Sequence, residues 1–134
     1  MTVLGVESSC DECSAAVVVD GRQVLSSVVA TQEEFHRPYY GVVPEIASRL
    51  HIESIRAVVE SGKGLGDVDG LAVTSRPGLI GSLLVGLSFV KGLAFASGLP
   101  FVGVDHILAH LYAPQLDRAV PYPYLGLLVS GGHT

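Results

Sequence analysis

The sequence predicts an α/β fold with a mixed β-sheet, and three observations support this. Three short apolar segments come first and are separated by turn residues, which is typical of an antiparallel meander. From residue 44 onward, helix-like and strand-like segments alternate, which favours βα crossovers and helices on the faces of the sheet. Hydrophobic residues make up 49% of the 134 residues and charged residues only 16%, so a large buried sheet or an interface is expected.

The antiparallel part is expected to contain strands at residues 3–7, 14–19 and 24–30. Asp20-Gly21 separates the second strand from the third and is a typical hairpin turn. Residues 31–41 are polar and aromatic, so a loop is expected there.

The alternating part begins with a helix that is expected to start at Pro44, because proline favours the first turn of a helix. Apolar residues follow a helical spacing from there to about Gly62. A fourth strand is expected at residues 71–74.

Residues 78–96 form the longest apolar segment, which reads GLIGSLLVGLSFVKGLAFA. A membrane-spanning helix is one interpretation of such a segment. Lys91 and three glycines interrupt it, however, and strand-like segments flank it closely on both sides. We therefore expect a buried core helix.

The remaining elements are a strand at residues 101–104, a helix from 107 to about 116, and a sixth strand at 124–129. The first five strands, in this order, describe a ribonuclease-H-like sheet. The sixth strand leads into a Gly-rich turn at which the sequence stops, which indicates a second lobe. We expect an N-terminal lobe at residues 1–120 and the start of a second, truncated lobe at residues 121–134.

Charge and the N-terminal residues limit the function classes. The formal net charge of −5 provides no basic field for a nucleic acid, so an RNA substrate would be held mostly by another part of the protein or by a partner. The first residues, MTVLGVESS, contain neither a basic stretch nor a long apolar one, and predict no signal peptide. A cytoplasmic protein with reduced thiols is expected.

Cys10 and Cys13 flank two acids, Asp11 and Glu12, between the first two strands. A redox pair of the thioredoxin type is disfavoured, because no helix is predicted next to it and neighbouring acids raise a thiol pKa. A zinc site would need two more ligands, and the chain has no other cysteine. Two interpretations remain. The cysteines are small residues in a hairpin turn, or the two acids face a ligand and position a cation or a substrate amine.

His106 and His110 are four residues apart, with His106 directly before the last predicted helix and His110 within it. Residues at this spacing share a helix face, so both imidazoles can bind one metal ion. Two solvent-facing histidines are the alternative. The zinc protease motif His-Glu-x-x-His is disfavoured, because Ile107 stands where that motif has its general base. Asp105 could bind or orient a ligand, and a third metal ligand would have to come from elsewhere.

Two glycine-containing turns could bind an anion through backbone N–H groups. The first is Ser130, Gly131, Gly132, His133 and Thr134 after the sixth strand, and the second is Arg76-Pro77-Gly78 before the apolar helix. An ordinary turn is the alternative at each position.

Taken together, these segments resemble the TsaD family. The resemblance rests on five ordered blocks, VLGVESSCDECSAAVV, GVVPEIASRLH, AVTSRPGLIGSLLVGLSFVKGLA, VDHILAHLYAP and LLVSGGHT, and covers the N-terminal part of that family. The family consists of tRNA N6-threonylcarbamoyladenosine transferases that were long labelled glycoproteases. It belongs to the actin-like ATPase superfamily, in which a nucleotide lies between two ribonuclease-H-like lobes.

The resemblance implies an activity and a site. The family transfers a threonylcarbamoyl group from threonylcarbamoyl-AMP to N6 of the adenine beside the anticodon in tRNAs that read ANN codons. His106 and His110 would bind iron or zinc, and Ser130–Thr134 would bind the adenylate. Asp11 and Glu12 match acids near the active site, and Asp11 is the stronger catalytic candidate.

The resemblance also implies partners, namely tRNA, a TsaB-like paralogue and a TsaE-like ATPase, and a homodimer is a further expectation. Cys13 stands where the family has Thr, and Tyr40 replaces a Gly of its H-x-x-Y-G-G stretch. The third metal ligand, a C-terminal Asp, has no counterpart, so the fragment alone is expected to be inactive. The alternatives are a metalloprotease and a non-catalytic dimerisation module.

Overall fold

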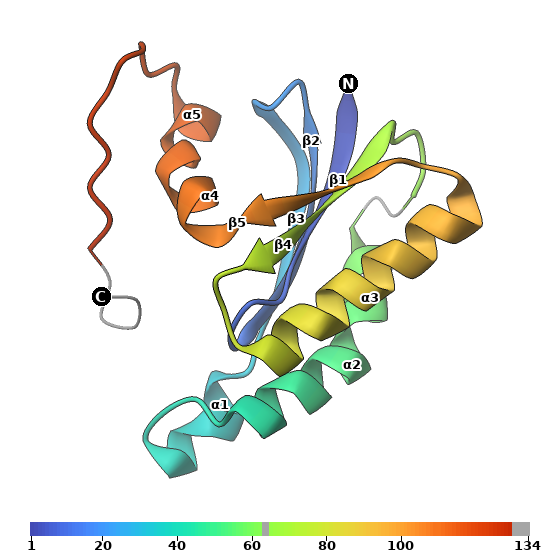
Figure 1. Ribbon diagram of the computed structural model, residues 1–134, viewed down its shortest axis with the longest axis vertical. Coiled ribbons are helices and arrows are strands. Elements are labelled where there is room, and N and C mark those ends of the chain that lie inside the picture. Colours follow the sequence, from blue (N-terminus) through green and yellow to red (C-terminus); the bar gives the residue numbers. More distant parts are fainter. Residues whose placement is uncertain (63–64, 130–134) are drawn as a thin grey trace.

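The fold is built on a five-stranded mixed sheet, shown by a computed structural model that describes residues 1–62 and 65–129 (Figure 1). The strands are β1 (Thr2–Glu7), β2 (Glu12–Val19), β3 (Gln23–Thr31), β4 (Gly70–Arg76) and β5 (Phe101–Asp105). Their order in the sheet is β3-β2-β1-β4-β5. β1, β2 and β3 pair antiparallel, and β4 and β5 extend the sheet in parallel from β1. The predicted mixed sheet of the ribonuclease-H-like type is confirmed.

The strand pairing brings distant residues to one edge of the sheet. Val6 of β1 pairs with Ala15 of β2 on one side and with Val73 of β4 on the other. Because β1, β4 and β5 are parallel, their carboxyl ends meet at the same edge. The residues that follow these ends come from three separate parts of the sequence.

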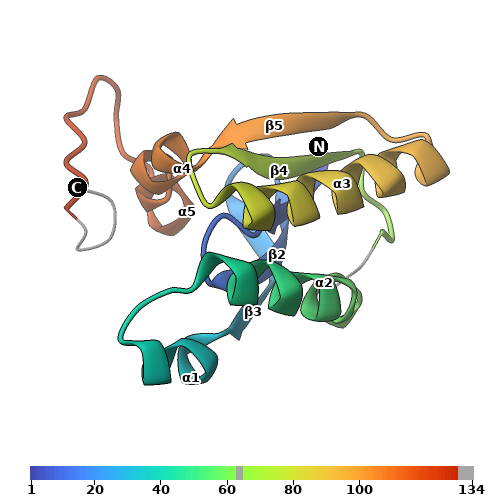
Figure 2. The same ribbon diagram turned by 60° about the horizontal axis from the view of Figure 1, so that its bottom comes forward.

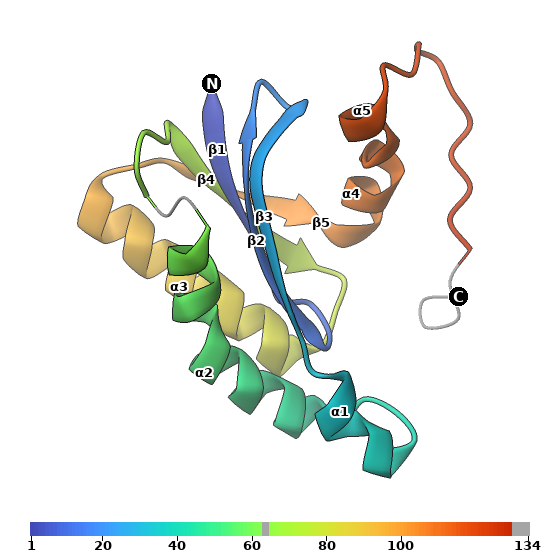
Figure 3. The same cartoon turned by 180° about the vertical axis from the view of Figure 1, so that it is seen from behind.

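The helices lie on both faces of the sheet (Figure 2). They are α1 (Glu33–His36), the 3₁₀ helix η1 (Arg37–Tyr39), α2 (Pro44–Ser61), α3 (Ile80–Ser97), α4 (His106–Tyr112) and α5 (Pro114–Asp117). α2 and α3 lie side by side on one face, and α4 and α5 lie on the other, as the view from behind also shows (Figure 3).

The core lies between the sheet and the α2–α3 layer, because side chains alternate along each strand. Leu4 and Val6 of β1 point to this side, whereas Gly5 and Glu7 line the opposite face. The other buried core residues are Cys13, Ala15, Val17, Ile55, Val58, Val59, Leu71, Val73, Val90 and Ala94. The face that carries Glu7 is therefore left for α4, α5 and the site.

The apolar helix α3 is buried along one stripe only, which corrects the prediction of a buried core helix. Its buried residues are Ser82, Gly86, Val90 and Ala94, spaced four apart, and they let the helix lie close to β4 and β1. Phe95, by contrast, is 93% exposed. In the described part of the chain, α3 is the one helix long and apolar enough to cross a membrane, a test that core helices of soluble proteins also pass.

Three further expectations need correction. The predicted loop at 31–41 contains α1 and η1, and the helix predicted from 107 to about 116 is divided into α4 and α5, with Pro114 starting the second. The predicted sixth strand at 124–129 is not formed, and Leu125 and Leu127 are exposed. An apolar run becomes a strand only where a neighbouring strand accepts its backbone hydrogen bonds, and the described residues offer none there. That residues 121–134 start a second lobe stays a prediction.

Candidate metal and transfer site

The candidate site lies at the sheet edge where β1, β4 and β5 end. A cleft of about 410 Å³ opens there between the sheet and the α4–α5 segment. Its walls include Gly5, Ala16 and Ala72 from the sheet, and His106 and His110 from α4. The small residues of the strands leave room for the cleft, and the two imidazoles form its polar rim.

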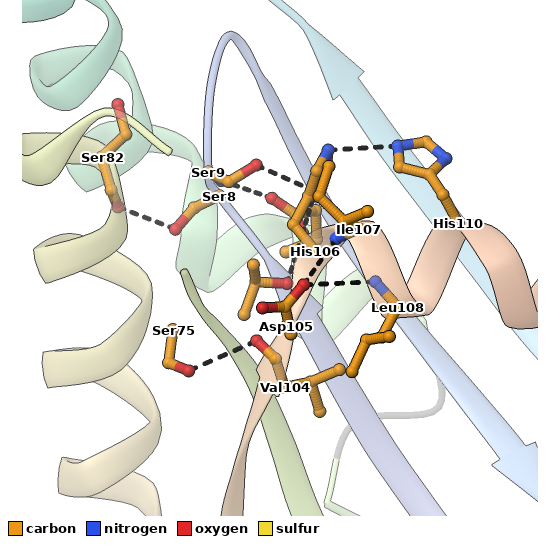
Figure 4. Close-up of polar contacts among 12 residues, drawn as sticks. Ser8, Ser9, Ser75, Ser82, Val104, Asp105, His106, Ile107, Leu108 and His110 are labelled. Atoms are coloured by element: carbon orange, nitrogen blue, oxygen red, sulfur yellow. Dashed lines mark hydrogen bonds and ion pairs between the residues drawn. The ribbon is translucent and has the colours of Figure 1, made fainter. Parts of the chain in front are cut away.

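The two predicted metal ligands face each other. Their Nε2 atoms are 3.1 Å apart, the ring centroids are 4.5 Å apart, and the ring planes are nearly perpendicular at 85° (Figure 4). Two imidazoles that bind one zinc ion tetrahedrally hold their nitrogens about 3.3 Å apart. The i, i+4 spacing therefore produces the expected pair, with a separation that suits a shared ion.

Glu7 is the carboxylate that contacts His106, and the sequence analysis did not single it out. Oε2 of Glu7 lies 3.3 Å from Nδ1 of His106, and Oγ of Ser9 lies 3.2 Å from the same nitrogen. Glu7 also accepts hydrogen bonds from the Ser9 amide and the Thr74 hydroxyl. A charged residue at the end of a buried strand is the signal that could have identified it.

Two opposing effects set the charge of Glu7. Burial raises its pKa, but the hydrogen bonds from Ser9, Thr74 and His106 outweigh burial, so the pKa lies below its ordinary value. Glu7 is then a carboxylate at neutral pH and favours the His106 tautomer that carries its proton on Nδ1. This tautomer leaves the Nε2 lone pair directed toward His110, as in carboxylate–histidine–metal arrangements.

The donor set fits a borderline divalent ion. Two imidazole nitrogens suit zinc or iron, and the Glu7 carboxylate orients one of them. Within residues 1–62 and 65–129, no group of three or more His, Cys, Asp or Glu side chains is placed to hold an ion. The described residues would thus supply two ligands of an incomplete set.

The Ser8–Ser9 turn behind Glu7 is held by α3. Both serines are buried, and the Ser8 hydroxyl donates to the Ser82 carbonyl at 2.8 Å. The Leu79 amide donates to the Ser9 carbonyl at 2.8 Å. Gly86 lies so close that a Cβ there would be 2.3 Å from the Ser8 hydroxyl. The position of Glu7 therefore depends on helix α3 as well as on β1.

Asp105 caps helix α4. Its carboxylate accepts hydrogen bonds from the Ile107 amide at 2.9 Å and the Leu108 amide at 3.2 Å. Nε of Arg76 lies 3.3 Å from the second carboxylate oxygen of Asp105. The Arg76-Pro77-Gly78 turn, one of the two predicted anion sites, therefore contains an ion pair within the chain. The structure thus gives Asp105 a local role, namely to start the helix that carries both histidines.

Asp105→Ala is expected to lower the free energy of unfolding by about 1 kcal/mol, because the helix loses its cap. Asp105→Asn keeps an oxygen that can accept both amide hydrogen bonds and is expected to stay within a few tenths of a kcal/mol of the unmodified chain. Urea unfolding of the two variants measures the difference. An equal loss in both would contradict the capping role and indicate that the exposed pair with Arg76 matters instead.

Asp11 and Glu12 lie where the chain passes from β1 into β2. Asp11 ends the turn after β1 and is half-buried, and Glu12 is the first residue of β2 and is exposed. The contacts described above for His106 are with Glu7, Ser9 and His110. The catalytic role of Asp11 and Glu12 stays a prediction.

The neighbouring thiols are poorly suited to redox chemistry. Burial, followed by a hydrogen bond with Asp11, raises the pKa of Cys10 to about 11, and burial also raises the pKa of Cys13. Cys13 is fully buried in the core, where it faces α2. Both cysteines are free.

Cys10 is expected to react with iodoacetamide about tenfold more slowly than free cysteine at pH 8. A pKa of about 11 lowers the thiolate fraction about a hundredfold, and the greater basicity of the thiolate recovers about tenfold of the rate. Mass spectrometry of the alkylated chain across pH 7 to 11 measures the rate, and the urea-unfolded chain is the control. A rate that reaches its plateau below pH 9 would contradict the raised pKa.

The predicted adenylate-binding residues, Ser130, Gly131, Gly132, His133 and Thr134, lie outside the described residues. The described chain ends at Val129, and Tyr124 donates a hydrogen bond to the Leu111 carbonyl at 3.0 Å. That contact attaches the preceding segment to α4, the helix that carries the histidines.

Comparison with known proteins shows which sequences this chain resembles. A family model described as TsaD, tRNA N6-adenosine threonylcarbamoyltransferase, matches residues 23–134. Proteins with that enzyme name from Treponema denticola and Pelobacter propionicus are 60% and 57% identical to this chain over its whole length. The chain spans only 41% of the length of each of these relatives.

Two solved structures share the fold. YeaZ from Pseudomonas aeruginosa is 24% identical with a TM-score of 0.52, which shows the fold alone. An uncharacterized protein with similarity to peptidase YEAZ, from the same organism, is 28% identical with a TM-score of 0.54. Each match covers 78% of this chain and 43% of the other.

Proposed function

Because the chain belongs to the TsaD family, we propose that it forms the N-terminal part of a tRNA N6-adenosine threonylcarbamoyltransferase. The proposed reaction moves a threonylcarbamoyl group from threonylcarbamoyl-AMP to N6 of the adenine beside the anticodon, in tRNAs that read ANN codons. The observation that carries the proposal is the pair of imidazole Nε2 atoms 3.1 Å apart, with Glu7 behind one of them.

In the proposed reaction, N6 attacks the carbamoyl carbon, the bond from that carbon to the phosphate oxygen breaks, and AMP leaves. A bound iron or zinc ion would supply a Lewis acid for the threonylcarbamoyl end of the substrate. His106 and His110 would hold that ion, and Glu7 would keep His106 in the tautomer that binds it. Asp11 would accept the proton that N6 releases.

Positioning must supply much of the rate, because an exocyclic adenine amine is a weak nucleophile. The largely apolar walls of the cleft, such as Ala16, Ala72 and Ala109, would limit water around the reactive carbamoyl group. The adenylate would be bound by Ser130–Thr134. Two imidazoles are an incomplete ligand set, so residues 1–134 alone are expected to be inactive.

The exposed side of the α2–α3 layer fits a protein partner. A groove of about 520 Å³ between these helices is lined by Ile52, Leu84, Val85 and Phe89, and Ile80 and Phe95 are exposed along α3. A partner that adds its own helices would bury this surface. We infer that a TsaB-like paralogue binds there in the cytoplasm, with a TsaE-like ATPase as a further component; a homodimer would use the same surface.

The decisive experiment supplies the full-length enzyme and its partner proteins with threonylcarbamoyl-AMP that carries radiolabelled threonine. Label is expected in a tRNA with adenine beside the anticodon and not in the same tRNA with guanine at that position. A peptide added to the same reaction is expected to remain uncleaved. Peptide cleavage without labelled tRNA would instead support the old metalloprotease label, which Ile107 argues against.

A further inference from the structure

Three buried polar side chains, none of which lines the cleft described above, are linked to one another by hydrogen bonds. Gln32 follows β3, His36 ends α1, and His51 lies in the middle of α2. Gln32 and His36 are each 4% exposed, and His51 is not exposed at all. Buried polar groups are costly unless they are hydrogen-bonded, so their partners are informative.

The three side chains form one continuous series of hydrogen bonds. The Val43 amide donates to Nδ1 of His36 at 3.2 Å, and Nε2 of His36 lies 3.1 Å from Oε1 of Gln32. The Gln32 amide nitrogen lies 3.3 Å from Nδ1 of His51. The series ends where Nε2 of His51 meets the Cys10 carbonyl at 2.9 Å.

The direction of the series is fixed by its two ends, because a backbone amide can only donate and a carbonyl can only accept. His36 must accept at Nδ1 and so carries its proton on Nε2, and His51 must donate from Nε2 and so accepts at Nδ1. Gln32 can satisfy both neighbours in one orientation only, and its amide nitrogen also donates to the Ala47 carbonyl at 3.3 Å. Every link therefore depends on the others.

The series holds two consecutive carbonyls of the turn that contains the predicted catalytic acid. His51 donates to the Cys10 carbonyl, and the backbone amide of Gln32 donates to the Asp11 carbonyl at 3.2 Å. At its other end the series fixes Val43, the residue directly before α2. Buried hydrogen bonds thus connect the turn at Asp11 to the segment at residues 33–43.

We propose that Gln32, His36 and His51 are positioning residues, which hold the Cys10–Asp11 turn in its working place through this one-directional series of hydrogen bonds. The inference rests on the proposed function, because it takes Asp11 as the acid that receives the N6 proton. The three side chains are internal and act on Asp11 through its backbone.

The test compares His51→Phe with His51→Gln in the full-length enzyme. Phenylalanine keeps the ring but removes both hydrogen bonds, whereas glutamine can still donate to the Cys10 carbonyl. We expect His51→Phe to lower kcat for transfer about tenfold with KM for tRNA changed less than threefold, and His51→Gln to stay within threefold of the unmodified enzyme. Gln32→Met, which breaks the series at its centre, is the second variant should His51→Phe fail to fold.

Hydrogen exchange provides a readout that does not need activity. In His51→Phe, the peptides covering residues 8–12 and 32–43 are expected to exchange at least tenfold faster, including the Val43 amide, which lies three hydrogen bonds away from His51. Val58→Ala, a core change on the same helix, is the control for a general loss of stability and is expected to leave both peptides and kcat near their original values.

Unchanged exchange in both peptides would overturn the proposal, and so would faster exchange with full transfer activity. A loss of kcat in Val58→Ala equal to that in His51→Phe would also overturn it, because general destabilisation would then be sufficient. If the unmodified enzyme transfers no threonine to tRNA, the proposed function fails, and exchange still reports whether the series holds the turn.

Discussion

His106→Ala in the full-length enzyme is expected to remove the bound metal and to lower threonylcarbamoyl transfer at least about a hundredfold. In the proposed site the described residues would contribute two nitrogens, and the substitution would leave only that of His110. Changes to residues that merely orient a metal ligand already cost about 10- to 100-fold in affinity or activity, so the loss of a ligand should cost more. Elemental analysis and single-turnover transfer on the same preparation measure both effects.

Glu7→Gln changes the residue that orients His106 and is expected to have a smaller effect on metal binding than His106→Ala. Glutamine keeps the shape but has no charge to hold the proton on His106, so metal affinity is expected to fall about 10- to 100-fold. Arg22→Ala, in the exposed hairpin between β2 and β3, is the control and should change neither quantity. Metal content that is unchanged in His106→Ala would refute the ligand role, whatever happens to the rate.

Gly86→Ala is expected to destabilise the fold by about 1–3 kcal/mol, whereas Gly92→Ala on the same helix should be neutral or stabilising by up to about 1 kcal/mol. A Cβ at position 86 would lie 2.3 Å from the Ser8 hydroxyl and 3.5 Å from Val73, whereas one at position 92 meets nothing within 4 Å. The Ser8 hydroxyl cannot move away without leaving the Ser82 carbonyl, and both serines are fully buried.

Urea unfolding of the two glycine variants measures this difference, and helix propensity is the same in both, so the difference between them reports contact with the Ser8 turn. In the full-length enzyme, Gly86→Ala should also weaken metal binding, since Ser8 directly follows Glu7. Equal stability of the two variants would show that α3 can shift away from the sheet at no cost.

The sequence predicted the parts of this structure that depend on local patterns. Periodicity located the five strands and the long helices, and the i, i+4 spacing alone was sufficient to pair His106 with His110. Turns and helix starts, such as the helix start at Pro44, could also be predicted, because the residues that favour them act within a few positions.

Other features depend on contacts between segments that are far apart in the sequence, and periodicity does not report them. Glu7 meets His106 across 99 residues, and Gln32 meets His51 because β3 and α2 are packed together. The exposed side of α3 could not be predicted because every face of that helix is apolar. The segment at 124–129 has the composition of a strand, but composition does not provide a neighbouring strand.

The alternation of side chains along β1 makes the length of that strand as constrained as its composition. Leu4 and Val6 face the core while Gly5 and Glu7 face the cleft, so deleting a single residue from β1 would turn the carboxylate into the hydrocarbon interior. Extra residues at the Asp20-Gly21 hairpin, at the opposite edge, would leave that alternation intact. Engineers who graft loops onto this scaffold should therefore insert at the hairpin and leave β1 at its present length.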